Sequence, residues 1–253
     1  MTSPRTRLHW REALTILLGL AFLIGAAAVP GRPAENPSIE TALDGAVRIL
    51  ITLRWPGQST PSDVQGSGWT RSCTPARQGG YDVVVATAGH VVDVAGIVVE
   101  THLVGIPSVE VVVAYRDGQR FTADPETLRL DRVTDYGEIR IHTQAPRRVL
   151  PVGPGGAPLP GAALVAVASP GPLAFGVFSG HLILLAPIPV NGAPKSAWLA
   201  SIAVAPGASG APVFDSHGRV VATVIGLVEW AWGGRSAVIV PLPQALAESG
   251  GRS

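Results

Sequence analysis

Hydrophobic residues recur along most of this chain in short runs with a period of two. The first run extends from Val47 to Leu53, and similar runs rich in valine and isoleucine follow at short intervals. Alternation over a few residues, interrupted by turn residues, is typical of half-buried β-strands. A helical period is limited to a turn at 88–92 and a short segment at 243–248. The pattern therefore predicts an all-β body.

The expected strands fall into two groups, separated by a stretch from 144 to 161 that is rich in proline, glycine and alanine and has little periodicity. This stretch is the best internal boundary. Two groups of about six strands predict two six-stranded antiparallel β-barrels. The expected strands begin near residues 47, 66, 81, 109, 120, 128 and 138 in the first group, and near residues 162, 176, 196, 212, 219 and 236 in the second.

The N-terminal segment has a different pattern. Three arginines, the last at Arg11, precede an uncharged apolar run from Ala13 to Val29. At 17 residues, the run falls between the apolar region of a signal peptide, which spans about 7–15 residues, and a membrane-spanning helix of about 17–25 residues. The small residues at 26–28 suit a cleavage site, whereas the lack of polar breaks before Val29 suits an uncleaved anchor. Both alternatives predict an N-terminal hydrophobic helix.

Either alternative places the arginines in the cytoplasm and exports the rest of the chain. The protein is then membrane-anchored by a single pass with its body outside the cytoplasm, or secreted after cleavage. The parts expected are a signal peptide or anchor at 1–30, a linker at 31–44, a first barrel at 45–148, a second barrel at 149–246 and a tail at 247–253.

Composition narrows the choice of partners. The net charge is +1 and only 15% of the residues are charged, so no electrostatic feature points to a nucleic acid. Cys73 is the only cysteine, which excludes an intrachain disulfide and a metal site of the cysteine type. The histidines show no spacing typical of zinc ligands. No metal or other cofactor is expected.

Three short segments carry side chains that suit one reaction. They contain His90, Asp135 and, between two nearby glycines, Ser209. A serine hydroxyl needs a neutral imidazole to accept its proton, and the imidazole needs an acid to hold its tautomer. The segments predict a serine hydrolase with a base, an orienting acid and a nucleophile in this order. The first two residues fall in the first barrel and Ser209 in the second, so the site is expected between the barrels.

The residues before the serine suit a second requirement of this reaction, which is to stabilise the negative oxygen of the tetrahedral intermediate. Gly207 lets the backbone turn so that its own amide and the amide of Ser209 point the same way. These two N–H groups are the expected oxyanion hole.

From about Val47 to Leu246 the chain resembles the trypsin-like serine peptidases, with the greatest similarity to the bacterial Deg/HtrA group. The segment 87–92 is similar to the family's Thr-Ala/Asn-Ala/Asn-His-Val-Val, and 207–212 is similar to Gly-Asn/Asp-Ser-Gly-Gly-Pro. The resemblance implies a chymotrypsin-like fold, an acyl-enzyme and protein or peptide substrates. No PDZ domain is expected after Pro241, because few residues of this sequence follow.

The resemblance also implies a specificity pocket, although the sequence departs from the family pattern beside the serine. The pocket would be floored by Ala203 and walled by Thr223, Val224 and Ile225. None of these is charged, so cleavage after a small or aliphatic residue is expected. Ala211 stands where the family has its second glycine, and the added methyl group could crowd the loop.

Two other interpretations make different demands on this sequence. An α/β-hydrolase would need its acid and its histidine after Ser209, together with alternating strands and helices, and neither fits this sequence. A protease-like domain that binds without cleaving remains an alternative, because crowding at Ala211 could remove activity from a complete set of catalytic side chains.

Overall fold

The computed structural model describes residues 39–94, 96, 107–153, 158–190, 193–231 and 233–242, all of which belong to one compact unit. The hydrophobic helix expected within 1–30 and the tail at 247–253 lie outside the described residues. In the described part, no helix is long and apolar enough to cross a membrane.

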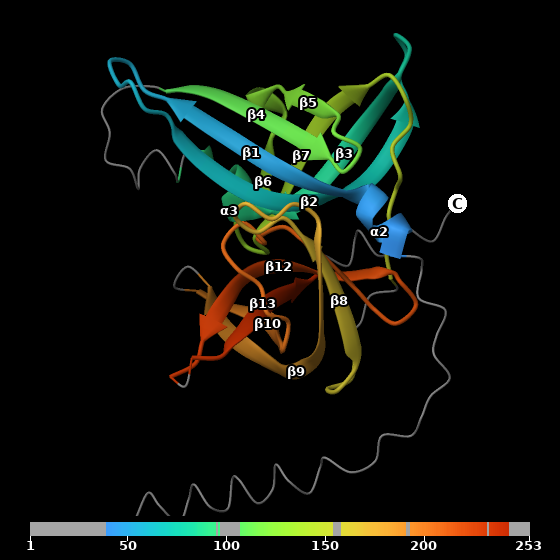
Figure 1. Ribbon diagram of the computed structural model, residues 1–253, viewed down its shortest axis with the longest axis vertical. Coiled ribbons are helices and arrows are strands. Elements are labelled where there is room, and N and C mark those ends of the chain that lie inside the picture. Colours follow the sequence, from blue (N-terminus) through green and yellow to red (C-terminus); the bar gives the residue numbers. More distant parts are fainter. Residues whose placement is uncertain are drawn as a thin grey trace, which may run out of the picture. The chain divides into compact units, whose positions relative to one another are not determined.

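The first group of strands forms a seven-stranded sheet with the order β5-β4-β1-β2-β3-β7-β6 (Figure 1). All neighbouring strands in it are antiparallel. Their bounds are β1 Ala46–Arg54, β2 Ser62–Pro75, β3 Tyr81–Ala88, β4 Ser108–Tyr115, β5 Arg120–Ala123, β6 Arg129–Asp131 and β7 Tyr136–Thr143.

This sheet corrects one detail of the expected architecture. In place of a closed six-stranded barrel, the structure has a curled half-barrel in which no ladder joins the edge strands among the described residues. The short β6 is one edge strand of this sheet, and it pairs only with the beginning of β7, from Tyr136 to Glu138. Strand β5 contacts β7 across the gap without forming a ladder.

The second group forms the expected closed barrel of six antiparallel strands, with the order β10-β13-β12-β11-β8-β9 (Figure 1). Small and branched side chains such as Ala166, Val213 and Ile239 are fully buried in its core. The bounds are β8 Ala163–Ala168, β9 Gly176–Val190, β10 Ala193–Ala200, β11 Pro212–Phe214, β12 Val220–Glu229 and β13 Arg235–Pro241.

Strand β1 confirms the period-two pattern that predicted it. Ile49, Ile51 and Leu53 are completely buried in one core cluster. Arg48 and Leu50 lie between them in the sequence and are only partly buried. Successive side chains of a strand point to opposite faces, so a half-buried strand must alternate in this way.

Helix α2 (Ile39–Gly45) was not expected, because it falls in the segment predicted to be a linker at 31–44. Ala42 and Leu43 are buried in a cluster that also contains Trp69 and Leu150. A helix of seven residues has about two turns and shows too little of a 3.6-residue period to be recognised in a sequence. Its position is decided by this packing.

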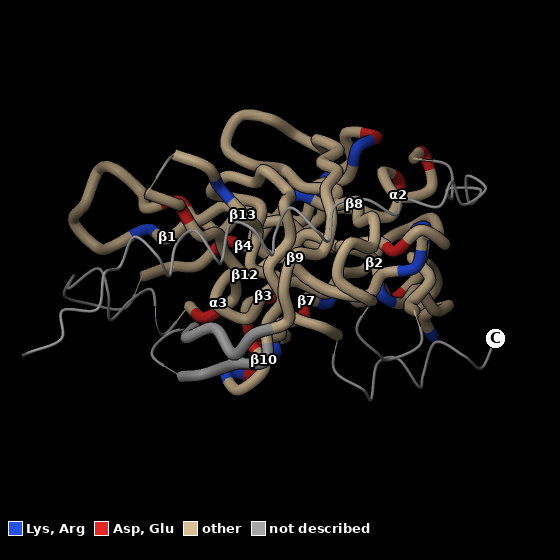
Figure 2. Tube along the Cα trace, turned by 90° about the horizontal axis from the view of Figure 1, so that it is seen from below, with Lys and Arg blue, Asp and Glu red and all other residues tan. Residues whose placement is uncertain are grey.

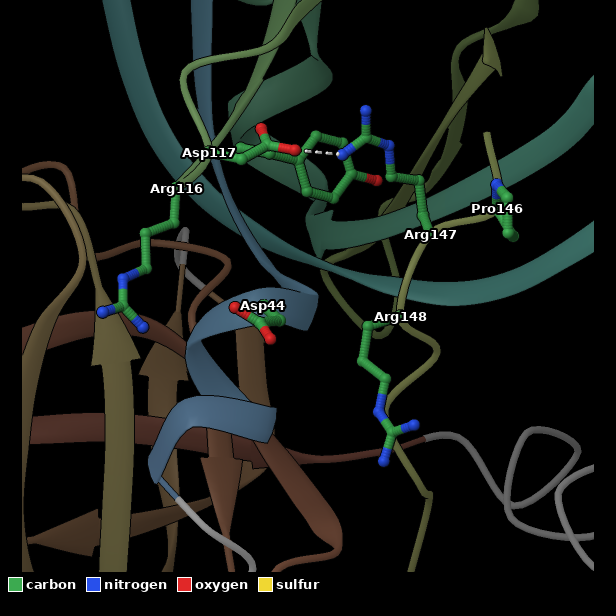
Figure 3. A pocket seen from close by; sticks show the side chains of 7 residues that line it. Asp44, Arg116, Asp117, Pro146, Arg147 and Arg148 are labelled. Carbon is green, nitrogen blue, oxygen red and sulfur yellow. Dashed lines mark hydrogen bonds and ion pairs between the residues drawn. The ribbon is translucent and has the colours of Figure 1, made fainter. Parts of the chain in front are cut away.

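A buried arginine anchors the connector that leads from the first sheet to the second barrel (Figure 3). The Arg147 guanidinium lies 4.5 Å from the Tyr115 ring centroid and 4.8 Å from that of Phe121. Its Nη1 donates a hydrogen bond to Asp117 Oδ2 at 2.7 Å. The guanidinium groups of Arg116 and Arg148 line the same pocket but point in other directions. The arrangement stabilises the connector.

Charged residues of both signs are distributed over the described chain, with long uncharged stretches along the strands (Figure 2). Several pairs are in direct contact, including Arg132 with Asp93 and Arg235 with Glu229. Such exposed pairs contribute little to stability.

Burial of Tyr115 makes the stability of this fold depend on pH in the alkaline range. Burial raises the pKa of Tyr115 to about 12, despite the opposing effects of its Thr70 hydrogen bond and of Arg147. An unfolded chain releases this proton near pH 10. Between these values the folded state retains a proton that the unfolded state has lost, so stability falls as pH rises.

We expect the free energy of unfolding to fall between about pH 10 and 12, with Tyr115 contributing a slope of up to about 1.4 kcal/mol per pH unit. Urea unfolding at several pH values measures the slope. The Tyr115→Phe variant should have a shallower slope than the wild type. Equal slopes would contradict the assignment.

Candidate active site

The register of one ladder brings His90 and Asp135 together. Strand β3 ends at Ala88, which pairs with Tyr136 at the start of β7. Helix α3 (Gly89–Val92) follows β3 directly, and Asp135 directly precedes β7. Two residues 45 positions apart in the sequence therefore meet at one end of the β3–β7 pair.

The two side chains form a hydrogen-bonded pair with very unequal exposure. His90 Nδ1 lies 3.0 Å from Asp135 Oδ2, and the His90 backbone N–H donates to Asp135 Oδ1 at 2.8 Å. The aspartate side chain is only 3% exposed, whereas the histidine side chain is 38% exposed. A buried carboxylate on Nδ1 favours the tautomer with its proton on that nitrogen, which leaves Nε2 free to accept a proton.

The backbone of Asp135 is held in an unusual conformation. Its φ angle is 55°, in the left-handed region that few residues other than glycine adopt. The Gly89 N–H donates to the Asp135 carbonyl oxygen at 2.7 Å and helps to hold this conformation. A Cβ atom at position 89 would lie 3.0 Å from Asp135 Oδ1 and 2.7 Å from Leu130 Cδ1. The smallest residue is therefore needed beside His90.

The loop that carries Ser209 is bonded to both sheets. The carbonyl oxygen of Ser209 accepts a hydrogen bond of 2.7 Å from the Ser67 N–H in β2. The next amide, that of Gly210, donates to the Val224 carbonyl oxygen in β12 at 2.7 Å. Among the described residues the Ser209 hydroxyl makes no hydrogen bond, either to His90 or to any other group. The structure thus pairs His90 with Asp135 and places the serine loop against the first sheet.

Gly210 allows this close approach. Its φ angle is +91°, and a Cβ atom there would lie 2.0 Å from the Ser67 carbonyl oxygen and 2.2 Å from Thr87 Oγ1. Those two oxygens are themselves joined by a hydrogen bond of 2.7 Å. Thr87 lies three residues before His90 in the sequence, so the serine loop packs on the segment that leads to the histidine.

Two amides of this loop are unpaired within the described part of the chain, namely those of Gly207 and Ser209. By contrast, the N–H of Ala208 donates to Ala205 at 3.0 Å, and that of Ala211 donates to Ala208 at 3.0 Å. These are the two amides that the sequence predicted as an oxyanion hole. The oxyanion hole stays a prediction, and both of its amides are available for it.

The methyl group of Ala211 is accommodated by the barrel. Ala211 is fully buried and belongs to the core cluster of the second barrel. Its carbonyl oxygen accepts from the Val224 N–H at 3.0 Å, which joins the serine loop to β12 a second time. Crowding of the loop by this methyl group is therefore not apparent.

The residues predicted to form the specificity pocket have different environments. Val224 belongs to the barrel core, whereas Ala203 is exposed. Ile225 is buried in the apolar cluster that contains Ile49 and Ile51 of the first sheet, and Thr223 is also buried. The structure brings the wall residues next to one another on β12 without placing Val224 on an open surface. The pocket remains a prediction.

The sequence pattern did not mark Ser67 as a site residue. Its hydroxyl donates to the Gly207 carbonyl oxygen at 2.8 Å and accepts from the Ser169 N–H at 2.9 Å. The only sequence signal is the pair of flanking glycines at 66 and 68. In the part of the chain that the structure describes, no group of three or more His, Cys, Asp or Glu side chains could hold a metal ion.

A substitution at Gly210 tests the close approach of the loop to the first sheet. We expect Gly210→Ala to lower the free energy of unfolding by well over 1 kcal/mol, because it adds a steric clash to an unfavourable φ angle. Gly118→Ala is the matched control, since Gly118 has a φ angle of +83° and open space around it. Chemical denaturation measures both variants, and similar losses would contradict the proposed contact.

Comparison with protein families identifies the chain. The family model for the trypsin-like peptidase domain matches residues 66–222, which is more than half of the sequence and includes His90, Asp135 and Ser209. A search of curated proteins found no match. The matched region covers most of the half-barrel and the first part of the closed barrel. On the basis of this match and the fold, the protein belongs to the trypsin-like peptidase domain family.

Proposed function

We propose that this protein is a serine endopeptidase in which His90 is the general base, Asp135 orients it and Ser209 is the nucleophile. The observation that supports the proposal most strongly is the His90–Asp135 pair, with a 3.0 Å contact and a carboxylate that is almost completely buried. The serine loop lies against the segment that precedes this histidine. Membership of a peptidase family supports the same reaction class.

The proposed reaction begins when His90 Nε2 accepts the proton of the Ser209 hydroxyl as Oγ attacks the carbonyl carbon of the peptide bond. The tetrahedral intermediate carries a negative oxygen, which the Gly207 and Ser209 amides stabilise. The imidazolium then donates its proton to the leaving amine, and the acyl-enzyme forms. His90 next accepts a proton from a water molecule that attacks the acyl-enzyme ester. It returns that proton to Ser209 Oγ as the second tetrahedral intermediate breaks down, which releases the carboxylic acid product and restores Ser209.

The missing serine–histidine hydrogen bond is compatible with this proposal. Catalytic hydrogen bonds are often long or poorly aligned in free enzymes and tighten when the substrate binds. The proposal therefore includes formation of the Ser209–His90 hydrogen bond in the complex.

We further propose that the substrate residue before the cleaved bond is small or aliphatic, because none of the predicted pocket residues, Ala203 and the stretch 223–225, carries a charge. Export of the body, with an anchor or a cleaved signal at 1–30, completes the proposal and rests on the sequence of that segment. A peptide library and fractionation of expressing cells test these two parts separately.

Reaction with a fluorophosphonate probe tests the nucleophile. We expect the wild-type protein to be labelled covalently and the Ser209→Ala variant to show no labelling, since an activated serine displaces fluoride from the probe and becomes phosphonylated. Ser201→Ala is the control, because Ser201 is exposed and hydrogen-bonded to His181 elsewhere on the barrel. Absence of labelling in the folded wild type would favour a binding domain without protease activity.

Replacement of the acid tests the orienting role. We expect Asp135→Asn to lower kcat/KM by roughly 10⁴-fold, because the amide favours the wrong imidazole tautomer. A second His–Asp pair, His142 Nδ1 with Asp82 Oδ1 at 3.3 Å, lies exposed on the same sheet. Asp82→Asn should leave kcat/KM unchanged. Similar effects of both substitutions on hydrolysis of a fluorogenic peptide would refute the assignment.

A further inference from the structure

We propose that Gln65 and Ser67, on strand β2, are positioning residues that set the orientation of the Gly207 and Ser209 amides across the junction between the two sheets. This inference rests on the proposed function of those amides. It assigns the geometry of the oxyanion-binding loop to side chains of the other sheet.

Gln65 holds a segment of the second barrel that in turn holds the serine loop. Its side-chain amide Nε2 donates to the Ser169 carbonyl oxygen at 2.5 Å and to the Gly171 carbonyl oxygen at 2.8 Å. The Gly171 N–H then donates to the Pro206 carbonyl oxygen at 3.1 Å. Through two hydrogen bonds, Gln65 is therefore linked to the peptide group that precedes Gly207.

The planarity of that peptide group transmits the constraint. A trans peptide places its C=O and N–H on opposite sides, so fixing the Pro206 oxygen also fixes the direction of the Gly207 N–H. Gly207 lies close to the side chain that controls it, since a Cβ atom at this position would be 3.2 Å from Gln65 Nε2. Its φ angle of +95° places the next peptide where Ser67 can reach it.

Ser67 fixes that next peptide. Its hydroxyl donates to the Gly207 carbonyl oxygen at 2.8 Å, and its backbone N–H donates to the Ser209 carbonyl oxygen at 2.7 Å. The same hydroxyl accepts from the Ser169 N–H at 2.9 Å, which connects it to the segment held by Gln65. The carbonyl groups on both sides of the loop are thus occupied, and the two amides are left available.

An arginine holds Gln65 in this orientation. Arg48 Nη2 donates to Gln65 Oε1 at 2.9 Å and to the Gly171 carbonyl oxygen at 3.3 Å. Because the guanidinium occupies the side-chain oxygen, the Gln65 nitrogen must face Ser169 and Gly171. A charged donor strengthens such a hydrogen bond, so Arg48 stabilises the arrangement from β1.

The test compares the wild type with Gln65→Leu, which keeps the size of the side chain and removes its donor. A fluorogenic peptide with alanine before the cleaved bond reports kcat and KM. We expect kcat to fall about 10- to 100-fold, less than the loss of a whole oxyanion donor, with KM changed less than about 3-fold. The split follows because the amides stabilise the transition state rather than the bound substrate.

Amide hydrogen exchange gives a readout independent of activity. The N–H groups of Ser169 and Gly171 are hydrogen-bonded in this network, and both should exchange faster in Gln65→Leu than in the wild type. Thr70→Val is the matched control, because it removes a buried hydroxyl hydrogen bond, to Tyr115 at 2.9 Å, within the same sheet. This control should leave kcat and the exchange of both amides unchanged. Should Gln65→Leu fail to fold, Ser67→Ala takes its place.

The outcomes separate this inference from the proposed function. A kcat within 2-fold of the wild type, or equal effects of Gln65→Leu and Thr70→Val, overturns the positioning role while the endopeptidase proposal stands. If the wild type neither cleaves the peptide nor reacts with a fluorophosphonate, the proposed function fails. Exchange then decides whether Gln65 controls the loop, since unchanged exchange at Ser169 and Gly171 overturns that control as well.

Discussion

The fully buried Ser67 is the point at which the site and the junction between the two sheets depend on the same hydrogen bonds. Its N–H and hydroxyl bind the carbonyl oxygens of Ser209 and Gly207, and its own carbonyl oxygen accepts from Thr87 Oγ1. A buried residue must satisfy its polar groups within the protein. Here they are satisfied by the serine loop and by the segment that leads to His90, so the two halves of the site are held by one residue.

The two sheets contribute in different ways. The closed barrel holds the serine loop through reciprocal hydrogen bonds with Val224, one from Gly210 and one to Ala211. The half-barrel holds His90 and Asp135 through the register of β3 and β7. A shared apolar cluster, which includes Trp69 from the first sheet and Phe214 from the second, packs between them. The relative position of Ser209 and His90, the proposed nucleophile and base, therefore depends on packing that extends well beyond these two residues.

Much of this organisation follows from local patterns. Strands such as β1 alternate between buried and partly buried residues because they face a core on one side, and this period is visible in the sequence. Helix α2 could not be predicted from such a period, because it is short and is stabilised by Leu150, more than 100 positions away. The open edge of the first sheet also could not be predicted, since closure depends on ladder geometry between distant strands. The environment of Ala211 could not be predicted either, because its methyl group packs in a barrel core built from distant strands.

The sequence by itself determined the strand pattern, the two-part organisation and the identity of the residues that suit a nucleophile, a base and an acid. These are set by periodicity and by residue chemistry, which are properties of short segments. The tertiary structure decided that the buried carboxylate of Asp135 is hydrogen-bonded to His90, and that Gln65 and Ser67 reach the loop around Ser209. Those contacts join residues 45 to more than 100 positions apart, and no local pattern specifies the hydrogen-bond partner of a side chain at such a separation.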